Sequence, residues 1–149
     1  MKRALAFIET GELRLARSLL EQISDYERKR LRVVGQNEEE SLVATLAGGY
    51  LGLIRHLAGH LAEADRIYRD LIARLSRFER YRSVSFFCHH RSSLKSRQRN
   101  LAKARSLINR STRATQAGKH QDLLHFARVS QGALAFKTWR SRAVIGAAM

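Results

Sequence analysis

Apolar residues recur every three or four positions along nearly the whole chain, and this spacing restricts the fold more than any other feature. Side chains at that spacing lie on one face of an α-helix, so each stripe predicts an amphipathic helix. The chain has no proline and no alternating runs rich in Val, Ile and Thr. We therefore predict an all-α fold. The clearest stripes are Leu13-Ala16-Leu20-Ile23, Leu61-Ala64-Tyr68-Leu71-Leu75-Phe78 and Leu101-Ala104-Ile108-Ser111.

Glycines separate the periodic segments. Gly11, Gly35, Gly59 and Gly118 each follow such a segment, and a glycine there fits the left-handed conformation that ends many helices. With 149 residues, the chain has the length of one domain. We predict a single helical domain over residues 1–139 and an irregular tail over 140–149. The predicted helices, about seven and antiparallel, lie near 2–9, 12–31, 38–58, 61–78, 82–97, 101–117 and 121–139.

A pattern recurs around three of the predicted turns. An alanine follows five residues after each turn residue, a bulky residue follows four later, and a small residue precedes the turn by seven. Small side chains let two antiparallel helices approach closely where they cross. The turn residues are Gly11, Gly59 and Arg99, and the other repeat positions are Ala4, Ala16, Leu20, Gly52, Ala64, Tyr68, Ser92, Ala104 and Ile108.

These positions resemble the tetratricopeptide repeat, and the segments 11–16 and 59–64 match its motif best. The turns at positions 11, 59 and 99 are spaced more widely than the roughly 34 residues of that motif, and its proline is missing. Longer, degenerate repeats of this kind are similar to the sensor arms of bacterial signalling ATPases and transcriptional activators, as is the segment 118–128. The resemblance implies a right-handed α-solenoid that binds a protein partner, as a piece of a longer array.

The positive charge lies almost entirely in the second half of the chain. Residues 1–76 contain 12 basic and 11 acidic residues, whereas residues 77–149 contain 16 and two. This asymmetry predicts an acidic or polyanionic partner. Because 22 of the 28 basic residues are arginines, compositional bias with a solvated basic face is the alternative interpretation.

The basic stretch 77–113 supplies the candidate binding residues. Rows of cations on neighbouring helices can hold an acidic peptide through arginine–carboxylate pairs, and they can equally follow a phosphate backbone. Phe86, Phe87 and Phe126 look like core residues, so aromatic stacking on bases is not expected. We predict a protein- or peptide-binding scaffold, with nucleic-acid binding as the alternative. The candidates are Arg91, Lys95, Arg99, Lys103, Arg110 and Arg113.

The sequence offers little chemistry of other kinds. Gly48-Gly49 lacks the lysine of a phosphate-binding loop, and Glu38-Glu39-Glu40 is interpreted as an acidic first helical turn. Cys88 lies among apolar neighbours, so we expect a buried structural thiol instead of a nucleophile. No enzyme activity, cofactor or metal site is predicted. The histidines weighed as metal ligands, alone or with Cys88, are His56, His60, His89, His90, His120 and His125.

Two further expectations concern location and assembly. The chain has no apolar run of about 18 residues and a single cysteine, so we expect a cytoplasmic protein that does not span a membrane. The apolar N-terminal start is interrupted by Glu9 and Glu12 and is too short for a signal peptide. Exposed apolar residues in the terminal segments, at 7–8 or 144–145, would support a homodimer.

Overall fold

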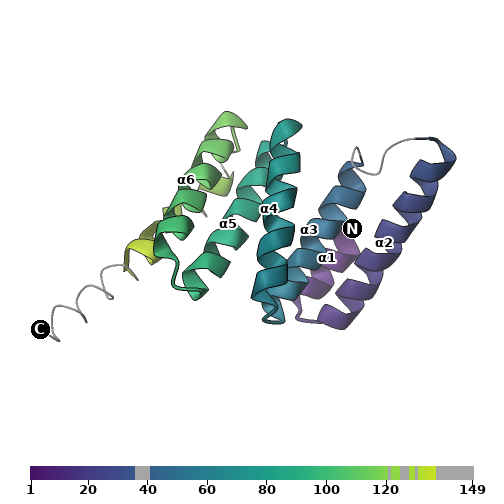
Figure 1. Ribbon diagram of the computed structural model, residues 1–149, viewed down its shortest axis with the longest axis horizontal. Helices are drawn as coiled ribbons and strands as arrows, with labels where there is room; N and C mark the ends of the chain where they lie inside the picture. Colours follow the sequence, from purple (N-terminus) through teal and green to yellow (C-terminus); the bar gives the residue numbers. More distant parts are fainter. Residues whose placement is uncertain (36–40, 121, 125–127, 130, 137–149) are drawn as a thin grey trace, which may run out of the picture. The chain divides into compact units, whose positions relative to one another are not determined.

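The computed structural model describes residues 1–35, 41–120, 122–124, 128–129 and 131–136, and these residues form helices joined by turns (Figure 1). The all-α prediction is therefore confirmed for this part of the chain. Residues 131–136, inside the last predicted helix, are helical, whereas the tail 140–149 lies outside the described residues. The helices are α1 (Lys2–Glu9), α2 (Leu13–Val33), α3 (Leu42–Leu57), α4 (Leu61–Arg77), α5 (Tyr81–Arg97) and α6 (Leu101–Ala117).

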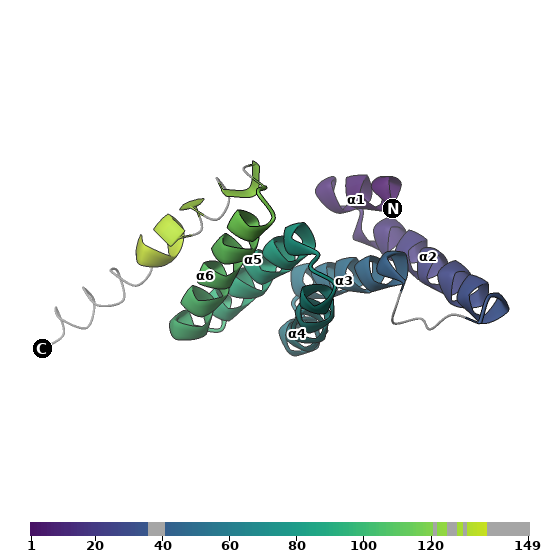
Figure 2. The same cartoon turned by 90° about the horizontal axis from the view of Figure 1, so that it is seen from above.

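The chain divides into two compact units, unit 1 (Met1–Leu71) and unit 2 (Ile72–Met149), and the boundary falls within α4. Helices that follow one another in sequence pack together inside each unit: α1 on α2, α2 on α3, and α5 on α6 (Figure 2). The short turns between α1 and α2 and between α5 and α6 make these neighbours antiparallel.

Unit 1 has an apolar core built from small and large side chains. Ala4 of α1, Ala16 and Leu20 of α2, and Ala47 and Ile54 of α3 are buried together. Half-buried apolar residues surround this cluster and include Phe7 and Ile8, so these two residues contribute to the core of unit 1. Residues 144–145 lie outside the described residues.

Gly52 marks the closest approach of α3 to α4. A Cβ atom placed there would lie 2.7 Å from Cγ2 of Ile67 and 3.5 Å from the ring of Tyr68. Ala64 and Tyr68 on the facing helix are both fully buried. A side chain at position 52 would therefore force Ile67 or the facing helix to shift, which favours glycine at this crossing.

Unit 2 has a second core between α5 and α6. Phe87, Cys88 and Leu94 of α5 are fully buried, and so is Ala104 of α6. Ala104, Ile108 and Leu134 form one cluster, so residues 131–136 help to cover α6. The core of unit 2 thus extends beyond the α5–α6 pair.

Four consecutive turns share one geometry. Gly59, Glu79, Arg99 and Lys119 all have positive φ, between 52° and 89°, and their positions are equally spaced along the chain. The residue after each one donates its backbone N–H to a carbonyl five residues back, at 2.9–3.0 Å, which is the Schellman arrangement. The turns that flank α4, α5 and α6 therefore recur in one strict register.

Two sequence predictions are wrong in detail. Gly118 has φ −82°, and Lys119 adopts the left-handed conformation instead. The third helix begins at Leu42 with Ser41 as its N-cap, not near residue 38. Glu38-Glu39-Glu40, interpreted from the sequence as an acidic first turn, lie outside the described residues. The side chain of Ser41 accepts a hydrogen bond from the Ala44 backbone N–H, and this cap fixes where the helix starts.

Candidate partner-binding surface

Buried hydroxyl groups fix the alignment of α5 against α6. The Ser85 Oγ lies 2.9 Å from the Ser111 Oγ and 2.6 Å from the Thr115 Oγ1. Nearer the turn, the Ser92 hydroxyl donates to the Ala104 carbonyl at 3.1 Å. Each of these buried hydroxyls thus has a hydrogen-bond partner, and the small side chains let the backbones approach. We call Ser85, Ser111 and Thr115 the hydroxyl cluster.

Two of the candidate cations, on different helices, influence Cys88. The positive charges of Arg91 on α5 and Arg110 on α6 both lower the pKa of the Cys88 thiol. Arg110 is exposed, and its Nη2 donates to the Ser76 hydroxyl at 2.9 Å. Arg91 is half-buried. The structure therefore brings together cations from two different helices.

The other four candidates lie toward the α5–α6 turn or on the outer face of α6. Lys95 is half-buried, and its Nζ donates to the Gln98 side-chain oxygen at 3.0 Å. Arg99 holds the left-handed turn position, and Lys103 lies in the first turn of α6, capped by Asn100. Arg99, Lys103 and Arg113 are exposed. Glu79 and Lys119 share the backbone strain of Arg99, so this strain does not single out Arg99 for a function.

Unit 2 carries a large excess of positive charge. Residues 72–149 contain 17 Lys and Arg residues but only two acidic residues, Glu79 and Asp122. The Asp122 carboxylate forms an ion pair with Arg82 at 2.8 Å. The two carboxylates of unit 2 are therefore too few to neutralise its 17 basic side chains. A solvated face of this kind attracts anions.

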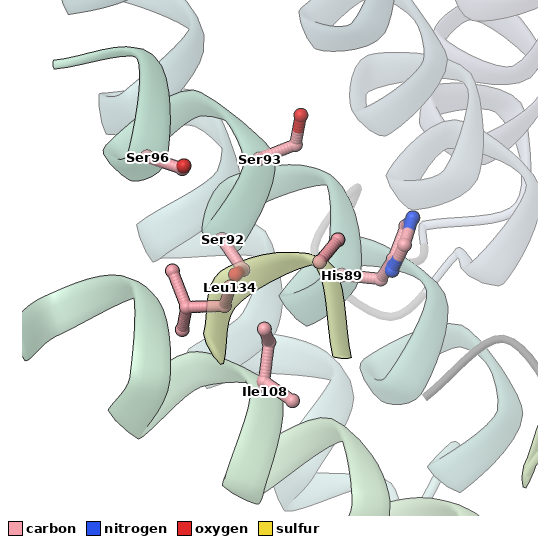
Figure 3. A pocket seen from close by; sticks show the side chains of 7 residues that line it. His89, Ser92, Ser93, Ser96, Ile108 and Leu134 are labelled. Carbon is pink, nitrogen blue, oxygen red and sulfur yellow. The ribbon is translucent and has the colours of Figure 1, made fainter. Parts of the chain in front are cut away.

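A small pocket lies between α5, α6 and residues 131–136 (Figure 3). It has a volume of about 160 Å³ and is lined by His89, three serines, Ile108, Ala133 and Leu134. Burial lowers the pKa of His89, which favours the neutral imidazole. The Ser92 hydroxyl is already bonded to the Ala104 carbonyl. The lining thus combines neutral polar groups with apolar side chains and includes no carboxylate or cysteine among the described residues.

Cys88 has the properties of a structural thiol, as the sequence predicts. It is fully buried, and burial raises the pKa of the thiol to about 11, against the opposing effect of Arg110 and Arg91. A thiol with this pKa is almost entirely protonated near pH 7, and the thiolate is the reactive form. Cys88 therefore serves packing.

The remaining sequence candidates do not converge. Over the described ranges, no group of three or more His, Cys, Asp and Glu side chains could hold a metal ion. His56 is buried against Tyr68, whereas His60 is exposed in the next turn. His125 and Phe126 lie outside the described residues. In the part of the chain that the structure describes, no helix combines the length and apolar character needed to cross a membrane.

Sequence reasoning missed three features of this surface. It did not identify the Ser76 hydroxyl as a partner of Arg110, the hydroxyl cluster, or the pocket beside His89. The run of serines at positions 92, 93 and 96 was the available signal for a polar helix face. Phe87 is buried as predicted, while Phe86 is only half-buried and packs against Phe87 and His90.

Comparison with known proteins adds no relative: no protein-family model, no curated protein and no solved structure matches this chain.

Proposed function

We propose that the chain is a non-enzymatic helical-repeat module, resembling tetratricopeptide repeats, that binds a segment of another protein. The observation that carries this proposal is the equal spacing of the left-handed turn positions 59, 79, 99 and 119. A repeated turn with helices of equal length is the construction by which helical repeats build extended binding surfaces.

The packing of small residues supports the same proposal. Gly52 lies against Ile67 and Tyr68, and Ser92 bonds to the Ala104 carbonyl across the α5–α6 pair. These residues hold equivalent places, seven before the turn positions 59 and 99. Repetition of a tight crossing at the same register is expected of a repeat array and has no role in a catalytic site. By this proposal, the array is a right-handed solenoid and a regulatory arm of a larger signalling protein.

Nucleic-acid binding through residues 77–113 is the second candidate. The observation that favours it is the charge of unit 2, with 17 basic residues against two acidic ones. Such a surface binds polyanions without sequence preference, and the affinity falls steeply with salt. Base stacking would require exposed aromatic side chains, and Phe78 is exposed within this stretch, whereas α6 contains no aromatic residue.

Selection from a displayed library of random peptides separates the two candidates. The purified protein should enrich a shared peptide motif if it is a peptide-binding module. In a parallel titration at about 0.15 M salt, a labelled single-stranded oligonucleotide should bind weakly, and its binding should not saturate below micromolar protein concentrations. Failure to enrich any motif, together with tight oligonucleotide binding and a steep salt slope, would establish the second candidate instead.

A further inference from the structure

We infer that Arg91, Lys95, Lys103 and Arg110, here called the cation row, form a seat for a short, extended acidic segment of a partner protein. This inference rests on the proposed function and specifies the chemistry of the partner. The row includes four of the six basic candidates, and its members come from two neighbouring helices of unit 2.

The alignment of α5 and α6 places the four cations along one seam. Arg91 and Lys95 are four residues apart on α5, and Lys103 and Arg110 are seven apart on α6, so each pair lies on one helix face. The Ser92 hydroxyl donates to the Ala104 carbonyl across the pair. This bond sets Lys95 of α5 and Lys103 of α6 at the same end of the pair, next to the turn that joins the two helices. Arg91 lies one helical turn beyond Cys88 on α5, and Arg110 on α6 reaches the Ser76 hydroxyl at 2.9 Å.

Two members of the row are held by neutral partners. Lys95 donates to the amide oxygen of Gln98, and Arg110 donates to the hydroxyl of Ser76. These bonds orient the two side chains, and neither acceptor carries a charge. Orientation before binding reduces the side-chain entropy that a ligand must overcome. The Arg110 guanidinium is thus oriented before a partner binds.

The length of the seam fits a short, extended peptide. Lys103 and Arg110 are separated by seven residues of helix, which is about 10 Å along the axis. An extended chain covers this distance in about three residues. Three or four acidic side chains would therefore meet all four cations, and arginine pairs well with carboxylates in a forked geometry.

The test uses a fluorescein-labelled twelve-residue peptide with four consecutive glutamates in a glycine–serine background. The control peptide replaces the glutamates with glutamines. One protein variant changes Arg91, Lys95, Lys103 and Arg110 to Gln. The matched variant changes four exposed arginines outside the row, Arg77, Arg97, Arg105 and Arg128, to Gln. Both variants lose four positive charges, and circular dichroism verifies that each remains folded.

We expect the acidic peptide to bind at least tenfold more tightly than the glutamine peptide. The variant of the cation row should lose about tenfold or more in affinity, and the matched variant less than about threefold. Equal losses in the two variants would mean attraction by bulk charge and would overturn the inference. Indifference to all four substitutions would overturn it too.

The proposed function can survive the failure of this inference. A library that enriches an uncharged motif would leave the binding module intact and would refute the acidic seat. Competition provides the third arm, because a single-stranded oligonucleotide that displaces the acidic peptide at lower concentration would assign the row to nucleic acid. That result, with no enriched peptide motif, would refute both proposals.

Discussion

Residues 1–71 contain 11 basic and 11 acidic side chains, whereas residues 72–149 contain 17 and two. Unit 1 uses this balance in ion pairs such as Arg17–Glu21, Arg30–Glu27 and Arg55–Glu63. Arg55 and Glu63 lie on α3 and α4, so their pair links two helices. Unit 2 joins α5 to α6 with uncharged hydroxyl groups instead, and two of its cations, Lys95 and Arg110, donate to neutral acceptors.

The contrast suggests that the two units have separate tasks. Exposed ion pairs contribute little to stability, on the order of 0–1 kcal/mol each, so the shortage of carboxylates in unit 2 has a small energetic effect. What changes is the field that a partner meets. Both units bury small residues where helices cross, so under the proposed function the charge of unit 2 would be the feature that attracts a partner.

The largest expected effect tests whether both units depend on the same kind of helix crossing. Ala64 and Ala104 are fully buried at equivalent places, five residues after turn positions 59 and 99. We expect Ala64→Arg and Ala104→Arg each to destabilise the protein by about 4 kcal/mol or more, since a buried, unpaired charge replaces a methyl group at a crossing. Urea unfolding followed by circular dichroism measures this.

Exposed alanines on the same helices provide the control for these substitutions. Ala62→Arg and Ala102→Arg place the same side chain on α4 and α6 at exposed positions, and each should change stability by less than about 0.5 kcal/mol. Unchanged stability of Ala64→Arg or Ala104→Arg would remove that position from the repeat assignment.

A smaller effect is expected from truncating the buried side chains that fill the space beside each helix crossing. Tyr68 and Cys88 lie nine residues after turn positions 59 and 79, and both are fully buried. We expect Tyr68→Ala to cost about 2–4 kcal/mol, because it leaves a large cavity in unit 1. Cys88→Ala removes one sulfur atom and should cost about 1 kcal/mol. A loss below about 0.5 kcal/mol for Tyr68→Ala would contradict its placement in the core.

The helices were predictable because they follow from the periodicity of apolar residues. Two of the four left-handed turn residues, Glu79 and Lys119, were not predictable. Gly59 signals a left-handed position in the sequence. Glu79 and Lys119 adopt the same conformation without any sequence signal, because most residues avoid it. The sequence therefore predicted turn residues at 11, 59 and 99, but it did not predict the equal spacing of the left-handed residues at 59, 79, 99 and 119. The N-terminal spacing is longer because α2 has 21 residues and α3 begins only at Leu42.

The binding surface was predictable only as a list of charges. Helical spacing placed Arg91 with Lys95 and Lys103 with Arg110, but it could not relate one helix to the other. That relation depends on the Ser85–Ser111 contact, whose partners are distant in sequence. Serine occurs in many surroundings, so nothing in the sequence marks these two as an interhelical pair.

Raising the pH should reduce the stability of unit 2 first and that of unit 1 at higher pH. In unit 2, burial raises the pKa of Cys88 from 9.0 to about 11. The unfolded thiol ionises from about pH 9, while the folded thiol stays neutral, so unfolding becomes more favourable as pH rises from 9 to 11. The expected loss is about 2 kcal/mol. Burial raises the pKa of Tyr68 in unit 1 as well, from an ordinary value of 10.0.

Urea unfolding at pH 8 and pH 10.5 measures this loss in the native protein and in three variants. Cys88→Ala should lose less stability than the native protein between these pH values, because its thiol is absent. Tyr68→Phe should show a similar but smaller sparing effect, since tyrosine begins to ionise at higher pH. Tyr26, which is 67% exposed, supplies the control, and Tyr26→Phe should behave like the native protein. Equal losses in all four proteins would mean that these burials do not control the pH dependence.

The smallest expected effect is on local stability when salt is added, which should decrease slightly in unit 1 and increase slightly in unit 2. Screening weakens ion pairs such as Arg17–Glu21 in unit 1, and it relieves repulsion among the cations of unit 2. Raising the salt concentration from about 20 to about 200 mM should lower the opening free energy of amides in α2 slightly and raise that of amides in α6, each by about 0.5 kcal/mol or less. Native-state hydrogen exchange resolves the two units separately. A shift of the same sign in both would mean that charge balance does not distinguish how the units are stabilised, and the basic face would then differ from unit 1 only in what it attracts.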